Sequence, residues 1–143
     1  MYRNTEFLVT PDFKRDALMT LQSMGITKII VDFDGANKNT DINIQTVDGL
    51  ADDNAYRELP LPDDFLSRYR DRLQTDLLVV FIEDWADALL YQADDCWYRE
   101  DGSFGEVSIK PMSLEINIEM NERVSNIIER SFSLGVEPSN PER

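Results

Sequence analysis

The segment over residues 63–93 constrains the fold most, because no other stretch of the chain keeps a helical spacing of apolar residues for so long. Large apolar side chains recur there at every fourth position: Phe65, Tyr69, Leu73, Leu77, Phe81, Trp85 and Leu89. A period of four drifts against the helical turn of about 3.6 residues, so the apolar stripe winds around the helix. We therefore expect either one curved helix over a twisted sheet or a helix that breaks near residues 74–76.

Alternation of apolar and polar residues predicts strands on both sides of this segment. The predicted strands cover residues 27–33, 42–45, 107–109, 114–120 and 128–134, and a helix over 123–133 is the alternative to the last. Thr10-Pro11-Asp12 and Gly25 are start and stop signals for a helix between them. The order α-β-β-α-β-β-β predicts an α+β fold: two layers, with a mostly antiparallel sheet of 4–5 strands and helices on one face.

The remaining segments have no clear period. We expect a single domain over 1–136, followed by a disordered tail over 137–143. Within the domain we expect a loose lead-in over 1–10, a polar turn over 34–41 and a loop over 46–62. We also expect an aromatic-rich connection over 94–105 and a break after the fourth strand at 121–123. The apolar run at 77–82 is far shorter than the roughly 20 residues that a bilayer span needs. Because the N-terminus lacks the apolar region of a signal peptide, we expect a cytoplasmic location.

Charge is the least ordinary part of the composition: 28 acidic against 14 basic residues give a formal net charge of −14. The surplus is concentrated in residues 31–100, which hold seventeen acidic and six basic residues. Such a field repels nucleic acid and anionic membranes and attracts basic protein surfaces. We expect a protein partner with a basic surface, and neither nucleic acid nor a membrane as a direct partner. Solubility alone is the other interpretation of the charge.

The chain has no histidine and a single cysteine, Cys96. The lack of histidine removes the commonest general base, the usual nucleophile triads and most zinc sites. One cysteine forms neither an internal disulfide nor a multi-cysteine metal site. We expect no cofactor, and we expect Cys96 to be a buried packing residue beside Trp97.

The Asp-x-Asp-Gly sequence at 32–35 follows an apolar strand and so resembles the first motif of the haloacid-dehalogenase-like phosphatases. The resemblance implies that Asp32 is the nucleophile and a magnesium ligand and that Asp34 is the general acid/base. That family needs a parallel sheet with crossover helices, whereas the strand at 42–45 follows a turn of hairpin length. A magnesium-dependent phosphohydrolase is therefore the alternative to a protein without enzymatic activity.

The same turn also offers oxygen ligands for a hard cation, from Asp34, Asn37, Asn39 and Asp41. It departs from an EF-hand loop because Gly35 comes too early and no glutamate closes the loop. Asp32, Asp34 and Asp41 are weak candidates for a calcium or magnesium site, and a solvated turn is the simpler interpretation.

A second resemblance rests on several segments together. They are residues 21–35 (LQSMGITKIIVDFDG), the strand at 41–44, Ala88-Leu89-Leu90, the W-x-x-x-D-G-x-F-G pattern at 97–105, and Asn121-Glu122-Arg123. These segments are similar to an uncharacterised family of small bacterial domains that plasmids and other mobile elements often carry. The resemblance covers roughly residues 13–125. It implies a domain of unknown function in which the Asp-Gly turn is structural.

These observations favour binding over catalysis. The hypothesis is an acidic inhibitor from a mobile element that imitates the charge of nucleic acid and so blocks a host defence protein. The alternatives are the phosphohydrolase and a small domain that self-associates through residues 97–104. The candidate residues for binding a protein partner are Asp48, Asp52, Asp53, Glu58, Glu83, Asp84, Asp87, Asp94, Asp95 and Trp97.

Overall fold

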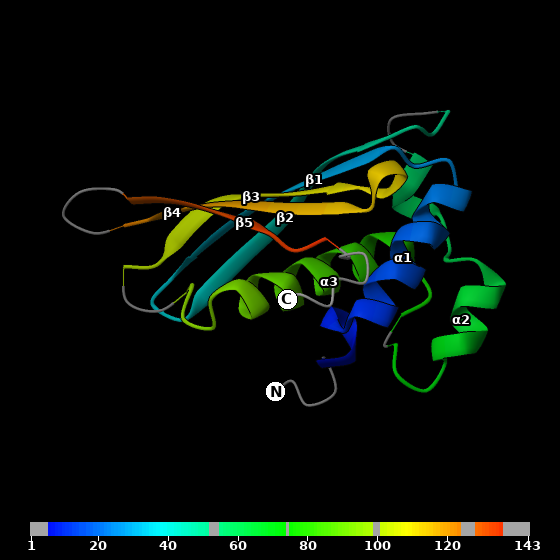
Figure 1. The fold of residues 1–143 in the computed structure, drawn as a ribbon, viewed down its shortest axis with the longest axis horizontal. Helices are drawn as coiled ribbons and strands as arrows, with labels where there is room; N and C mark the ends of the chain where they lie inside the picture. The colour runs from blue at the N-terminus through cyan, green and yellow to red at the C-terminus, as the bar shows by residue number, and fades with distance from the viewer. Residues whose placement is uncertain (1–5, 52–54, 74, 99–100, 124–127, 136–143) are drawn as a thin grey trace, which may run out of the picture.

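A computed structural model describes residues 6–51, 55–73, 75–98, 101–123 and 128–135 of the 143-residue chain. These residues form an α+β fold of two layers, in which a five-stranded antiparallel sheet lies over the main helices (Figure 1). The predicted fold class is confirmed. In chain order the elements are η1 (Glu6–Val9), α1 (Pro11–Ser23), β1 (Lys28–Ala36), β2 (Asn39–Asp48), η2 (Ala55–Glu58), α2 (Asp63–Tyr69), α3 (Leu78–Ala93), β3 (Ser103–Lys110), η3 (Pro111–Ser113), β4 (Glu115–Glu122) and β5 (Ile128–Ser133).

The strands lie in the order β2-β1-β3-β4-β5, and every neighbouring pair is antiparallel. β2 and β5 are therefore the edges of the sheet. Asn37 and Lys38 join β1 to β2 with φ of 53° and 69°, as a two-residue hairpin turn with two positive φ angles requires. The polar turn expected over 34–41 is thus wrong in extent, because β1 continues through Asp34 and Gly35 to Ala36.

The sheet face toward the helices is apolar, because alternate residues of each strand point to the same side. The buried apolar residues of the three inner strands are Ile29, Val31, Phe33, Val107, Ile109, Ile116, Ile118 and Met120. They share one core with Leu18 of α1 and with Phe81 and Trp85 of α3. The opposite face of the sheet is polar and open, which is the half-wet arrangement typical of an antiparallel sheet.

The long apolar stripe forms two helices rather than one. α2 ends at Tyr69 and α3 begins at Leu78, so the expected break near residues 74–76 is confirmed. Backbone hydrogen bonds hold the break: the Leu61 N–H donates to the Asp76 carbonyl at 2.8 Å, and the Leu78 N–H donates to the Leu59 carbonyl at 3.0 Å. The segment that enters α2 is thereby paired with the segment that enters α3.

The lead-in is more ordered than expected over its second half. Residues 6–9 form η1, and Leu8 is 4% exposed because it packs into the core. The Nε1–H of Trp85 donates to the Leu8 carbonyl at 2.8 Å. A buried apolar side chain and a bonded carbonyl are the physical reasons that the expectation of a loose segment fails here.

Other boundaries also differ from expectation. β2 runs to Asp48 and η2 occupies 55–58, where Tyr56 is 4% exposed, so the loop over 46–62 is largely structured in the described residues. β4 continues to Glu122, and β5 is a strand, which excludes a helix over 128–133. The tail predicted over 137–143 lies outside the described residues. In the part of the chain that the structure describes, no helix has the length and apolar character to cross a membrane.

Candidate functional site

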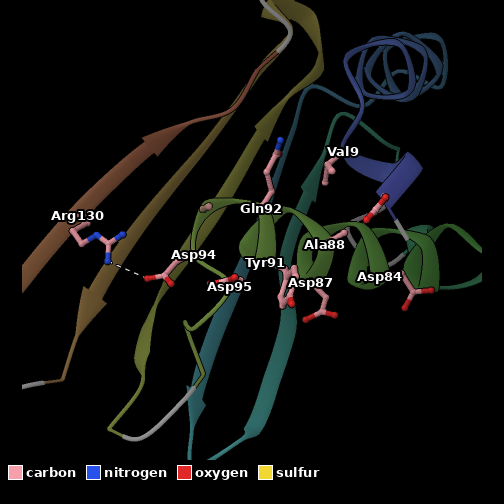
Figure 2. A pocket seen from close by; sticks show the side chains of 11 residues that line it. Val9, Asp84, Asp87, Ala88, Tyr91, Gln92, Asp94, Asp95 and Arg130 are labelled. Carbon is pink, nitrogen blue, oxygen red and sulfur yellow. Dashed lines mark hydrogen bonds and ion pairs between the residues drawn. The ribbon is translucent and has the colours of Figure 1, made fainter. Parts of the chain in front are cut away.

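The outward side of α3 lines a hollow of about 720 Å³ between η1 and β5, which we call the α3 groove (Figure 2). α3 has two sides because residues three, four and seven positions apart share a face of a helix. The core side carries the buried residues Leu78, Phe81, Ile82, Trp85, Ala86, Leu89 and Leu90. The groove side carries Asp84, Asp87, Ala88 and Tyr91, and continues past the helix end to Asp94.

Five carboxylates from three segments line the α3 groove. They are Glu6 of η1, Asp84 and Asp87 of α3, and Asp94 and Asp95 just beyond α3. Arg130 of β5 is the one cation among the described residues that line the groove. Val9, Ala88 and Ala93 supply apolar surface between the charges. The groove thus combines an apolar floor with a strong excess of negative charge.

Loss of water raises the pKa values of the carboxyl groups on this part of α3. The pKa of Asp87 is raised first by burial and then by the neighbouring charge of Asp84. Burial also raises the pKa of Asp84, and burial followed by the charge of Asp84 raises the pKa of Glu83. Keeping these groups ionised therefore costs free energy, which a cation placed in the groove would offset. Carboxylates held in this way are typical of functional sites.

Arg130 forms the β5 side of the α3 groove. It lies opposite the buried Met120 in the strand register, so its side chain points toward the helix layer. Its Nη1 donates to Oδ2 of Asp94 at 3.0 Å and to a carboxylate oxygen of Glu122 (Figure 2 draws the bond to Asp94). The hydrogen bond to Glu122, with that to Asp94, raises the pKa of the guanidinium. The groove therefore already holds one guanidinium against its carboxylates.

The structure brings together four of the predicted binding residues and separates the others. Asp84, Asp87, Asp94 and Asp95 line the α3 groove, and Glu83 is the neighbour of Asp84 on α3. Two more lie elsewhere and do not line the groove: Asp48 ends β2, and Glu58 ends η2. Asp52 and Asp53 lie outside the described residues. Four of the predicted binding residues thus share one hollow along α3 and the segment just after it.

Trp97 and Cys96 differ from the sequence interpretation in opposite ways. Trp97, a predicted binding residue, is 2% exposed and packs edge to face on Phe33 with ring centroids 5.4 Å apart, so its side chain offers no surface to a partner. Cys96 was expected to be buried, and it is exposed. It lies in a turn where its N–H donates to Oδ1 of Asp94 at 2.9 Å, and this turn directs Trp97 inward and Cys96 outward.

The sequence did not indicate Glu6 and Arg130 as groove residues. Glu6 lies in a segment expected to be irregular, and Arg130 lies in a strand whose neighbours could not be ordered from the pattern alone. The spacing of Arg130 and Phe132 along β5 is the signal that could have indicated Arg130, because it places both side chains on one face of that strand. The register with β4 is what turns that face toward α3.

A second acidic hollow, of about 510 Å³, lies on the open face of the sheet. The weak metal candidates Asp32, Asp34 and Asp41 line it together with Glu106 and Glu119. We call these residues the sheet-face cluster. Their proximity follows from register, because Asp34 lies opposite Asp41 on β2, and Asp32 lies opposite Glu106 on β3. Like charges directly opposite one another are unfavourable in a sheet, and the charge of Asp34 is offset by Arg123.

The sheet around Asp32 differs from that of the phosphatases that its motif resembles. β1 pairs antiparallel with both β2 and β3, so Asp32 lies within a strand and not at the carboxyl end of a parallel one. Asp34 is already paired, with its Oδ1 2.8 Å from Nη2 of Arg123. Catalysis by this pair stays a hypothesis.

Fold and site together define a small α+β domain with an acidic groove between a helix and an edge strand of its sheet. Residues 9–134 match a family described as "Family of unknown function (DUF6878)". Because the match covers most of the chain, the protein belongs to this family. No curated protein and no solved structure matches the chain. The expected membership of an uncharacterised domain family is confirmed, and its association with mobile elements stays a prediction.

Proposed function

We propose that the protein is a non-enzymatic binding module that takes a basic segment of another protein into the α3 groove. The observation that carries the proposal is that five carboxylates, from η1, α3 and the segment after α3, line one hollow. The volume of the hollow, about 720 Å³, lies within the range of roughly 300–1,000 Å³ that is usual for ligand sites.

Electrostatics support a cationic partner. Burial raises the pKa values of Asp84 and Asp87, so bringing a cation near them is favourable beyond simple long-range attraction. The formal net charge of −14 adds a field that speeds the approach of a basic surface. The same field opposes direct binding of nucleic acid, whose affinity for proteins depends on Lys and Arg.

A finer form of the proposal concerns the identity of the partner. A basic surface that accepts these carboxylates is the kind of surface that otherwise binds phosphates. We propose that the partner is a host nucleic-acid-binding defence protein in the cytoplasm, and that the protein is a mobile-element inhibitor that competes with nucleic acid for it. The partner's affinity for nucleic acid should then fall as this protein is added.

The test is to measure binding of a short arginine-rich peptide at low and high salt. The double variant Asp84→Asn/Asp87→Asn should weaken binding about tenfold at low salt, since each exposed or half-buried ion pair contributes up to about 1 kcal/mol. The matched control is Asp48→Asn/Glu58→Gln, which removes the same charge from two sites outside the groove. Equal losses in the two variants would show that net charge, and not the groove, attracts the peptide.

The sheet-face cluster supports the enzymatic alternative, because it gathers carboxylates that a hard divalent cation prefers. In that alternative Asp32 and Asp34 serve a magnesium-dependent phosphohydrolase. Hydrolysis of a generic phosphate ester with magnesium, compared between the protein and Asp32→Asn, distinguishes it from a binding module. Self-association through residues 97–104 is the remaining alternative, and the burial of Trp97 does not favour it.

A further inference from the structure

Within the part of the chain that the structure describes, the edge of the sheet beside the α3 groove has an unused capacity for hydrogen bonds. β5 is the last strand in the sheet order, and among the described residues it pairs with β4 alone. The Leu134 N–H donates to the Ile116 carbonyl at 2.7 Å, which fixes the phase of the β4–β5 ladder. Because antiparallel residues alternate between bonded and non-bonded pairs, Arg130 and Phe132 bond inward to β4. The N–H and C=O groups of Ser131 and Ser133 therefore point away from β4, to the outside of the sheet.

The backbone groups of β5 alternate between the inner and outer edge, whereas its side chains alternate between the two faces of the sheet. Arg130 and Phe132 lie opposite the buried Met120 and Ile118, so they face the helix layer and the α3 groove. The Arg130 guanidinium carbon lies 5.0 Å from the centre of the Phe132 ring. Ser131 lies opposite the exposed Glu119 and so faces the open side. A strand added to β5 would likewise direct every second side chain over the groove.

The two edges of the sheet are not equivalent. The β1–β2 ladder contains a register shift at Ile30/Val31, and irregularities of this kind are a common device that protects an edge from pairing. Asp41 and Asp48 also place negative charge along β2. The β4–β5 ladder keeps an unbroken register, and β5 contains neither proline nor glycine. Its inward-pointing charge, Arg130, is already paired with Asp94 and Glu122. Among the described residues, β5 is therefore the edge more open to a further strand.

We propose that the basic partner segment binds as a sixth strand along β5, with Arg or Lys at alternate positions. Its backbone pairs with the outward groups of Ser131 and Ser133, as in other proteins that add a peptide strand to a sheet edge. Its alternate side chains face the α3 groove beside Arg130, whose guanidinium already binds Asp94. This inference depends on the proposed function, because it names the conformation and sequence pattern of the same basic partner.

The experiment compares two synthetic peptides of about ten residues with identical composition and charge. One alternates arginine and threonine, and the other places all its arginines in a single block. We expect the alternating peptide to bind about tenfold more tightly. N-methylation of its backbone at alternate residues, in the phase that pairs with β5, should remove this advantage while the charge is unchanged. The amide protons of Ser131 and Ser133 should exchange more slowly with solvent when the alternating peptide is bound.

A pair of protein variants gives an independent measurement. Ser131→Pro removes an outward N–H without removing a bond to β4, and proline is tolerated on edge strands. It should weaken binding of the alternating peptide about tenfold relative to the matched control Ser131→Ala, which keeps the N–H. If Ser131→Pro does not fold, the N-methylated peptide on the unaltered protein decides the question.

The outcomes separate the inference from the function on which it depends. If the block, alternating and N-methylated peptides bind equally and Asp84→Asn/Asp87→Asn weakens all three, the groove takes a basic segment in another conformation, such as a helix. The strand inference is then wrong and the proposed function stands. If no arginine-rich peptide binds even at low salt, both are wrong.

Discussion

Gly35 shows at the scale of one residue why the Asp-Gly sequence and the W-x-x-x-D-G pattern occur in the same chain. Gly35 is buried within β1, and a Cβ added there would lie 2.5 Å from Cζ3 of Trp97 and 2.8 Å from Cβ of Tyr98. A Cβ added to Gly102, whose φ is +75°, would lie 1.7 Å from the Gly35 carbonyl oxygen. The Asp-Gly sequence is therefore a packing site for the tryptophan, which agrees with its expected structural role.

We predict that Gly35→Ala lowers the free energy of unfolding by about 1–3 kcal/mol, because the new methyl group overpacks the Trp97 ring. Urea denaturation measures the loss. The loss should be smaller when the substitution is made in a Trp97→Phe protein, whose smaller ring leaves room. The same loss in both backgrounds would contradict the contact as its cause.

Asp87 gives a prediction about pH at the same scale. Burial, followed by the charge of Asp84, raises the pKa of Asp87 above its unfolded value of about 3.9. The folded state thus binds the proton more tightly than the unfolded state, so the ionised group lowers stability at neutral pH and does so less as the pH falls. Asp87→Asn should raise the free energy of unfolding at pH 7 by a few tenths of a kcal/mol.

This gain should disappear near pH 3, where the carboxyl group is protonated in both states. Urea denaturation at the two pH values measures it, with Asp48→Asn at the exposed end of β2 as the control. A gain that persists unchanged at pH 3 would mean that asparagine stabilises α3 for a reason other than charge.

At the scale of elements, one carboxylate of α1 binds two side chains of α2, beside the aromatic contacts of Phe13 with Phe65 and Tyr69. Oδ2 of Asp16 accepts a bond from Nε of Arg68 at 2.8 Å and from the Tyr69 hydroxyl at 2.6 Å, and Oδ1 accepts from Nη2 of Arg68 at 2.7 Å. Burial and the bond to Asp16 raise the pKa of Tyr69 to about 12. The protein should therefore lose stability as the pH rises from about 10 to about 12, where the unfolded tyrosine ionises first.

We predict that Asp16→Asn lowers the free energy of unfolding by about 1 kcal/mol, because it weakens the two-bond attachment of Arg68. It should also lower the pKa of Tyr69 by removing a charged neighbour that favours the neutral phenol. Ultraviolet titration of tyrosinate measures the pKa, and denaturation measures the stability. Asp12→Asn, on the first turn of the same helix, is the control. An unchanged tyrosine titration would show that Asp16 does not act on Tyr69.

The elements were predictable to different degrees, for physical reasons. Side-chain alternation in 114–120 and the Thr-Pro-Asp start at residue 10 are local signals, and β4 and α1 followed them closely. The ends of β1 and η1 depended on long-range contacts: Gly35 pairs with Ser103 and lies under Trp97, and the Leu8 carbonyl accepts a hydrogen bond from Trp85. No pattern within a segment of ten residues reveals partners that far away in the chain.

At the scale of the whole molecule, the negative charge is divided between two faces. The α3 groove lies on the helix side of the edge strand β5, and the sheet-face cluster lies on the open side of β1 and its neighbours. Composition predicted the excess charge, and the acidic residues picked out along the sequence included four of the groove residues. Composition could not predict that the charge is divided between the α3 groove and the open face of the sheet. The face on which a carboxylate lies depends on strand register and on the break between α2 and α3.

Nuclear magnetic resonance titration with an arginine-rich peptide locates the binding site, because it reports on backbone amides throughout the chain at once. If the peptide binds in the α3 groove, the largest shift changes fall on residues 84–95, on η1 and on Arg130. Changes centred instead on Asp32, Glu106 and Glu119, or spread evenly over the surface, would contradict the α3 groove as the binding site.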